Sequence, residues 1–106
     1  SQKIWIGELA YDTSRWELWK GDKRIHLTTA EIKLLHLLSS RLNSVVSRDD
    51  LIRSISVKPN NSEESQNKLR TIDVQIKRLR TKLETDPKVP RYLKTIRGQG
   101  YILQPD

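Results

Sequence analysis

The stretch between Leu69 and Leu83 constrains the fold more than any other part of this chain of 106 residues. Its apolar residues recur at spacings of three and four, which places them in one narrow stripe along an α-helix; they are Leu69, Ile72, Ile76, Leu79 and Leu83. At 100° per residue, the opposite face carries Arg70, Val74, Lys77, Arg78 and Thr81. The flanks carry Asp73 and Arg80 on one side and Thr71, Gln75 and Lys82 on the other. The pattern predicts a helix over about 67–84 that buries its stripe and exposes a basic, hydrogen-bonding face.

The positive charge of the chain is concentrated around this helix. The chain has 20 Lys and Arg against 13 Asp and Glu, for a formal net charge of +7. Residues 68–97 hold ten of the basic and three of the acidic side chains, so this segment alone carries an excess equal to that of the whole chain. Such segregation is typical of a face that binds a polyanion, although a solvated basic surface has the same composition.

The remaining sequence predicts a small sheet, two more helices and a hairpin. Residues 1–27 contain short β-favouring runs separated by turn signals, and we expect their three tryptophans to seal this sheet against a core rather than to form a ligand cage. Thr28 and Glu31 fit a capping box that begins a helix ending near Asn43, and a second helix begins at Ser47. The polar run 58–66 is interpreted as a loop, and residues 91–104 as a hairpin whose tip is Arg97-Gly98-Gln99-Gly100.

Several classes of protein are disfavoured by what the sequence contains. There is no Cys, and the two histidines, His26 and His36, lack the spacing of a helical zinc pair, so we expect no metal and no cofactor. No G-x-S-x-G motif is present, and neither histidine has a recognisable catalytic partner, which argues against an enzyme. No apolar run approaches the roughly 18–20 residues of a membrane span, and we expect no membrane association.

A helix with one buried stripe and a basic outer face suits the DNA major groove, which admits one α-helix and presents each base pair as a distinct hydrogen-bonding pattern. Arginine can bind guanine, glutamine can bind adenine, and lysine at the edges neutralises phosphate. An arginine at a glycine-flanked hairpin tip can enter the minor groove. The order helix, helix, basic helix and hairpin therefore predicts an α+β fold of the winged helix-turn-helix type, formed by residues 1–106 as one domain.

Two motifs also resemble those of the OmpR/PhoB-type effector domains of bacterial two-component response regulators. Residues 71–83, TIDVQIKRLRTKL, resemble the recognition-helix signature of that family, and residues 90–101, PRYLKTIRGQGY, resemble its wing motif. The resemblance implies a four-stranded antiparallel N-terminal sheet over 1–27, a three-helix core over 28–84 and a wing over 91–104. It also implies sequence-specific binding of double-stranded DNA and regulation of transcription. The DNA-binding residues that it implies are Arg70, Thr71, Val74, Gln75, Lys77, Arg78, Arg80, Lys82, Thr95 and Arg97.

The resemblance carries expectations about partners as well. Such domains usually bind direct-repeat half-sites as two protomers, so self-association on DNA is expected. A receiver domain is expected on the N-terminal side in the parent chain, and the location is expected to be the bacterial cytoplasm. Residues 57–67 correspond to a loop that often contacts RNA polymerase in the family, although here the stretch is longer than usual.

Three alternatives stay open from the residues alone. Val74 is as well suited to packing on the neighbouring loop as to contacting a base. Asp73 would repel phosphate, so it is expected to have a structural role near the start of the helix, either beside Lys77 or holding Arg70 or Arg97 in position. The whole basic face could instead serve a protein-interaction module or a non-specific polyanion binder.

Overall fold

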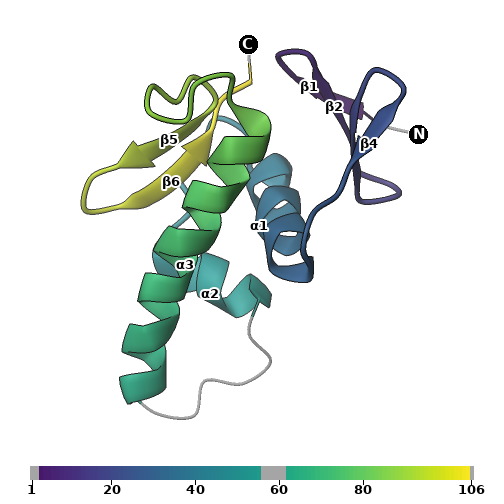
Figure 1. Cartoon of the computed structure of the whole chain (residues 1–106). Coiled ribbons are helices and arrows are strands. Elements are labelled where there is room, and N and C mark those ends of the chain that lie inside the picture. The colour runs from purple at the N-terminus through teal and green to yellow at the C-terminus, as the bar shows by residue number, and fades with distance from the viewer. Residues whose placement is uncertain (1–2, 56–61, 106) are drawn as a thin grey trace.

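The computed structural model describes residues 3–55 and 62–105, with side chains from residue 72 onward in the second range. Within these residues an N-terminal sheet is followed by three helices and a C-terminal hairpin, as expected for a winged helix-turn-helix (Figure 1). The elements are β1 (Lys3–Ile6), β2 (Leu9–Asp12), β3 (Glu17–Lys20), β4 (Lys23–Ile25), α1 (Thr29–Ser40), α2 (Arg48–Ile55), α3 (Ser62–Leu83), β5 (Leu93–Ile96) and β6 (Gly100–Leu103). The α+β architecture predicted from the sequence is confirmed.

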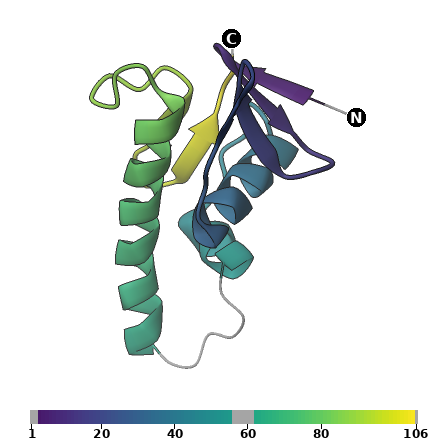
Figure 2. The same cartoon turned by 45° about the vertical axis from the view of Figure 1, so that its right-hand side comes forward.

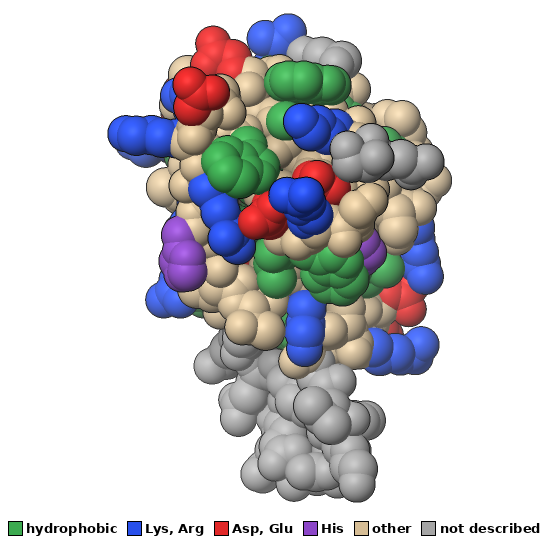
Figure 3. Space-filling view, turned by 90° about the vertical axis from the view of Figure 1, so that its right-hand side faces the viewer, with side chains coloured by type: hydrophobic (Ala, Val, Ile, Leu, Met, Phe, Trp, Pro, Cys, Tyr) green, Lys and Arg blue, Asp and Glu red, His purple; other side chains and the backbone are tan. Residues whose placement is uncertain are grey.

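The N-terminal sheet is antiparallel and has the strand order β1-β2-β3-β4. Its register pairs Tyr11 with Leu18, and both side chains are fully buried on the side of the sheet that covers α1. The other side of the sheet faces outward. On the surface of this part of the molecule, hydrophobic side chains are interspersed with lysine, arginine and acidic residues (Figure 3). The sheet therefore contributes one apolar layer to the core.

The prediction that the tryptophans seal this sheet is wrong. Trp5 is 59% exposed and Trp16 is 39% exposed. Trp16 precedes β3 instead of lying in it, has a φ of 57°, and stacks on the ring of His36 with the ring centroids 3.7 Å apart. Because Trp19 is adjacent in its strand to the buried Leu18, it faces the opposite side. Alternation along a strand separates two faces, but it cannot show which of them is covered.

The two predicted N-terminal helix caps are confirmed, whereas α1 ends at Ser40 with Arg41 as its C-cap, shortly before the expected stop at Asn43. The Thr28 hydroxyl accepts the backbone N–H of Glu31 at 3.2 Å and donates to the Glu31 carboxylate at 2.9 Å. Asn43 adopts a left-handed φ of 62° after the end of α1, which turns the chain away from the helix. The Ser47 hydroxyl accepts the backbone N–H of Asp50 at 3.2 Å and so begins α2.

Helix α3 is longer at its N-terminal end than predicted. It begins at Ser62 rather than near residue 67, so residues 62–66 of the predicted loop are helical, and residues 58–61 lie outside the described part of the chain. The first turns of α3 project beyond the other helices (Figures 1 and 2). The run has no Pro or Gly, and Glu63 and Glu64 follow Ser62, which suits a helix N-terminus. The absence of an apolar period in this run indicates that it is not buried. A helix end that projects beyond the core needs no apolar stripe.

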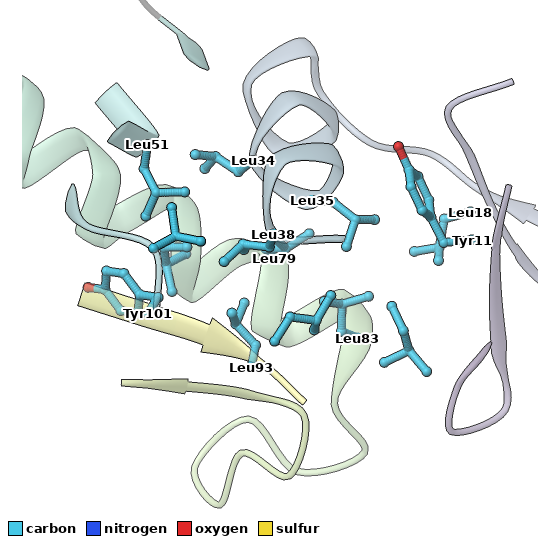
Figure 4. Close-up of a cluster of buried hydrophobic side chains, with 14 of the residues drawn as sticks. Tyr11, Leu18, Leu34, Leu35, Leu38, Leu51, Leu79, Leu83, Leu93 and Tyr101 are labelled. Atoms are coloured by element: carbon cyan, nitrogen blue, oxygen red, sulfur yellow. The ribbon is translucent and has the colours of Figure 1, made fainter. Parts of the chain in front are cut away.

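The core lies where α1, α3, the inner face of the N-terminal sheet and the hairpin meet (Figure 4). Four residues of the predicted stripe, Ile72, Ile76, Leu79 and Leu83, are buried there. They pack in one cluster with Leu38 of α1 and with residues of the other elements. This burial fixes the rotation of α3 about its own axis and thereby determines which side chains it presents outward. No helix within the described residues is both long and apolar enough to cross a bilayer.

Candidate nucleic-acid interface

The outward face of α3 carries the residues expected there. Val74 is 47% exposed, and Lys77, Arg78 and Thr81 are also exposed. The Thr81 hydroxyl donates to the backbone carbonyl of Lys77 at 3.1 Å, which leaves its methyl group and the oxygen lone pairs outward. The two cationic groups of this face therefore extend into solvent beside an apolar Val74, as a groove-reading helix requires.

Arg70 and Thr71 lie in the helical part of α3, but their side chains are outside the described residues. Their roles therefore stay predictions from the sequence.

Arg80 connects α3 to the hairpin. Its Nε donates to the backbone carbonyl of Leu93 at 2.9 Å, and its Nη2 donates to the Thr95 hydroxyl at 2.5 Å. The guanidinium carbon also lies 5.7 Å from the ring centroid of Tyr101. Two of the predicted DNA-binding residues, Arg80 and Thr95, are thus bonded to each other, and the remaining N–H groups of Arg80 are those available to a further partner.

Lys82 and Gln75 occupy a different environment from the outward face. Lys82 Nζ lies 2.7 Å from the Glu31 carboxylate, whose side chain is only 2% exposed. This ion pair joins the last turn of α3 to the first turn of α1. Gln75 is half-buried, and its amide oxygen is shielded from solvent with no hydrogen-bond partner among the described residues. Both side chains are therefore less exposed to solvent than those of Lys77 and Arg78.

The hairpin of β5 and β6 places Arg97, which is exposed, in the turn between the strands. Two backbone bonds between Val46 and Tyr101, of 2.8 and 3.0 Å, fix β6 close to the turn of the hairpin. Gly100 is required at this contact: its φ is 151°, and a Cβ atom there would lie 2.1 Å from the Val46 carbonyl oxygen. The glycine that the sequence suggested for a tight turn therefore also permits the close approach of two backbones.

Asp73 bonds to two elements at once. The Tyr101 hydroxyl donates to Asp73 Oδ1 at 2.6 Å, and Arg48 Nη2 lies 3.1 Å from the same oxygen and 3.3 Å from Oδ2. Asp73 thus has two partners that the sequence did not suggest, and neither Lys77 nor Arg97 bonds to it. The side chain of Arg70, the other expected partner, lies outside the described residues. Burial raises the pKa of Tyr101, and the bond to Asp73 raises it further. The nearby Tyr101 hydroxyl and the charge of Asp73 raise the pKa of Arg48.

Glu84, directly after α3, fixes the entry into the hairpin. Its carboxylate is buried and accepts the backbone N–H groups of Arg91, Tyr92 and Leu93 at distances between 2.7 and 3.2 Å. The backbone donors at the start of the hairpin are therefore satisfied by the side chain of the residue that follows α3. This contact could not be predicted from the sequence, because nothing in the local pattern around Glu84 indicates it.

Two shallow surface pockets flank the contact between Arg80 and Thr95. The first lies between α2 and the hairpin and is lined by Ser47, Arg48, Asp49, Thr95, Ile96, Arg97, Gly98, Gln99 and Gly100. The second lies along the outer face of α3 and is lined by Val74, Lys77, Arg78, Arg80, Thr81, Pro87 and Lys88. Arg48 and Lys88 belong to this surface but were not among the predicted contacts. The concentration of basic residues between 68 and 97 could have drawn attention to Lys88, whereas only the tertiary structure brings Arg48 beside the hairpin.

Comparison with known proteins finds a protein family whose model covers most of this chain. The family model for the C-terminal region of transcriptional regulatory proteins matches residues 22–103. Protein PetR of Rhodobacter capsulatus is 43% identical over 101 residues, which cover 95% of this chain and 43% of PetR. The chain thus spans less than half of the length of this relative.

Solved structures agree with this match. The response regulator DrrB of Thermotoga maritima, an OmpR/PhoB homologue, superposes with a TM-score of 0.80 at 33% identity, over 96% of this chain and 44% of DrrB. The RstA DNA-binding domain of Klebsiella pneumoniae, solved in complex with the RstA box, superposes with a TM-score of 0.78 at 27% identity over the full length of both chains.

Proposed function

This chain belongs to the family of C-terminal domains of transcriptional regulatory proteins of the OmpR/PhoB type, and from that membership we propose that its basic surface binds double-stranded DNA in a sequence-specific way and thereby regulates transcription. The proposal needs no catalytic step and no cofactor. It would place the chain with the bacterial chromosome in the cytoplasm.

One observation carries the proposal: α3 exposes Lys77, Arg78 and Thr81 on one face, beside a hairpin that is held to the same helix and has Arg97 at its tip. The major groove of B-DNA is wide enough for one helix, and an arginine in it can form two hydrogen bonds with a guanine. The tip arginine would then reach the adjacent minor groove.

The described contacts divide the predicted residues into two groups. We assign base or phosphate contacts to Arg78, Lys77, Val74 and Arg97, with Arg70 and Thr71 retained from the sequence. Gln75 also stays a proposed DNA contact, which requires its amide to turn away from the protein on binding. Arg80 and Thr95 would act together, because their mutual bond orients both toward one phosphate. For Lys82 we propose a structural role instead of a phosphate contact, since it is paired with Glu31.

Several partners belong to the same proposal. Two copies of the domain would occupy direct-repeat half-sites, and a receiver domain would precede this one in the parent chain, as in two-component response regulators. RNA polymerase is proposed to contact the chain through residues 57–67, of which 62–67 form the first turns of α3. A helical end that projects beyond the other helices is accessible to such a partner.

Selection from a random duplex library, followed by fluorescence anisotropy, tests the proposal. The selected duplex should bind roughly 10³-fold or more tightly than a scrambled one at the same salt concentration. Equal affinity for both would instead indicate a polyanion-binding module, and no binding to either would support a protein-interaction module.

Arg78→Ala should lower the affinity for the selected duplex by about 1–3 kcal/mol and relax the preference at one base pair. The matched control is Arg15→Ala, which removes the same charge from the exposed turn between β2 and β3. An equal loss from the two variants would show that Arg78 contributes charge alone.

A further inference from the structure

The Asp73 carboxylate lies at the surface where α2, α3 and the hairpin meet. It accepts the Tyr101 hydroxyl of β6 at 2.6 Å and pairs with Arg48 of α2 at 3.1 Å. The side chains of Asp73 and Arg48 are 45% and 48% exposed. A partly exposed ion pair contributes little to folding, so these bonds need a different explanation from the buried contacts of the core.

The hairpin does not depend on Asp73 to be attached to the domain. Leu93 and Leu103 at the base of the hairpin are fully buried, and the backbone bonds between Val46 and Tyr101 join β6, near the turn, to the segment before α2. The bond from Tyr101 to Asp73 adds a constraint on orientation, because it joins the second strand to a point on the recognition helix. It ties Arg48 to the same point, and Arg48 and Arg97 line one surface pocket.

We propose that Asp73 is a positioning residue for DNA recognition: one carboxylate on the recognition helix holds Tyr101 and Arg48, and so sets the position of the tip arginine, Arg97, relative to α3. This inference rests on the proposed function, since Arg97 and the outer face of α3 must contact the same duplex. Fixing both before binding reduces the conformational entropy that is lost in the complex.

The direction in which binding changes when Asp73 is removed distinguishes a positioning role from an effect of its negative charge alone. An exposed carboxylate beside a phosphate-binding surface repels DNA, so its removal by itself should strengthen binding. If Asp73 positions the hairpin, its removal should weaken binding despite the gain in positive charge. Another acidic residue, Asp49, lines the surface pocket that Arg48 and Arg97 also line, which makes it a control for the charge.

The experiment is a double-mutant cycle on this chain with the selected duplex, using Asp73→Asn, Arg97→Ala and the double variant. Asp73→Asn should weaken binding about tenfold, the order expected for losing charge-assisted hydrogen bonds. Arg97→Ala should weaken binding about tenfold in the original chain and only about twofold in the Asp73→Asn background. Asp49→Asn should bind as tightly as the original chain or more tightly.

Tyr101→Phe is the second variant, because it removes the same bond from the hairpin side and keeps the buried ring. It should reduce the effect of Arg97→Ala to the same extent, and circular dichroism should show that both variants are folded at the temperature of the assay.

Additive effects of Asp73→Asn and Arg97→Ala, or tighter binding by Asp73→Asn, would overturn the positioning role and leave the DNA-binding proposal intact. Failure of both Asp73→Asn and Tyr101→Phe to fold would also overturn it, since the bonds would then serve the fold. If the original chain prefers no duplex, it is the proposed function that fails.

Discussion

Replacing Lys82 by Met distinguishes a structural role for this lysine from a contact with DNA phosphate. Lys82 Nζ lies 2.7 Å from Glu31 Oε2, and the side chains are 30% and 2% exposed, respectively. The substitution leaves the buried carboxylate without its counter-ion, and breaking a buried pair in this way costs about 3–5 kcal/mol. Because the Thr28 hydroxyl still donates to Glu31 and Lys82 is partly exposed, we expect the loss to fall below that range, at about 2–3 kcal/mol.

Thermal and urea unfolding, followed by circular dichroism, measure this loss. For a domain of this size each kcal/mol corresponds to roughly 4–8 °C in Tm, so the midpoint should fall by about 10–20 °C. Lys77→Met is the matched control, since it removes the same charge from an exposed position of the same helix and should change the stability by less than about 0.5 kcal/mol. Adding Glu31→Gln to Lys82→Met should restore most of the loss, because a neutral amide needs no counter-ion.

The salt dependence of DNA binding supplies the second readout, at a temperature where all variants are folded. Each phosphate contact contributes about 0.9 to the slope of log K against log salt concentration. Lys77→Met should reduce the slope by about that amount, and Lys82→Met should leave it unchanged. A Lys82→Met variant that is as stable as the original chain and has the reduced slope would refute the structural role of Lys82.

Three further predictions concern the fold. Gly100→Ala should lower the free energy of unfolding by at least about 2 kcal/mol, because φ is 151° and the new methyl group would lie 2.1 Å from the Val46 carbonyl oxygen; an unchanged urea midpoint would contradict this close approach. Thr28→Ala should cost about 1 kcal/mol through loss of the α1 cap, and Thr28→Ser should restore most of it. Burial, followed by the charge of Asp12, raises the pKa of Tyr11 to about 12. In the unfolded chain the Tyr11 phenol ionises near pH 10, whereas in the folded chain it keeps its proton to higher pH. The contribution of Tyr11 to stability should therefore be retained below pH 10 and be lost between pH 10 and 12. An absorbance titration should show a tyrosine that ionises late, and Tyr11→Phe should remove both this late ionisation and the pH-dependent loss of stability.

Much of the architecture was predictable because it depends on local periodicity. The burial of Ile72, Ile76 and Leu79 follows from their spacing along one helix, and the outward position of Lys77 and Arg78 follows from the same geometry. The caps are local too, since a side chain and the backbone group that it satisfies are only a few residues apart.

The N-terminal end of α3 and the tryptophans were predicted incorrectly for related reasons. A polar run indicates lack of burial, and it does not distinguish a loop from a helix that extends beyond the core, as α3 does from Ser62. Alternation along a strand separates two faces, and only the position of α1 decides that the face with Leu18 is covered while Trp5 stays exposed.

The basic composition, the helical stripe and the hairpin motif determined by themselves that the chain forms a basic, partly exposed helix followed by a hairpin. Only the tertiary structure decided which charged side chains of that helix have partners among the described residues. Arg80, Lys82 and Asp73 lie on its flanks, where each meets a partner distant in the sequence: the Leu93 carbonyl and Thr95 for Arg80, Glu31 for Lys82, and Arg48 and Tyr101 for Asp73. A pattern along one helix gives the direction of a side chain, but its partners depend on which elements pack against that flank.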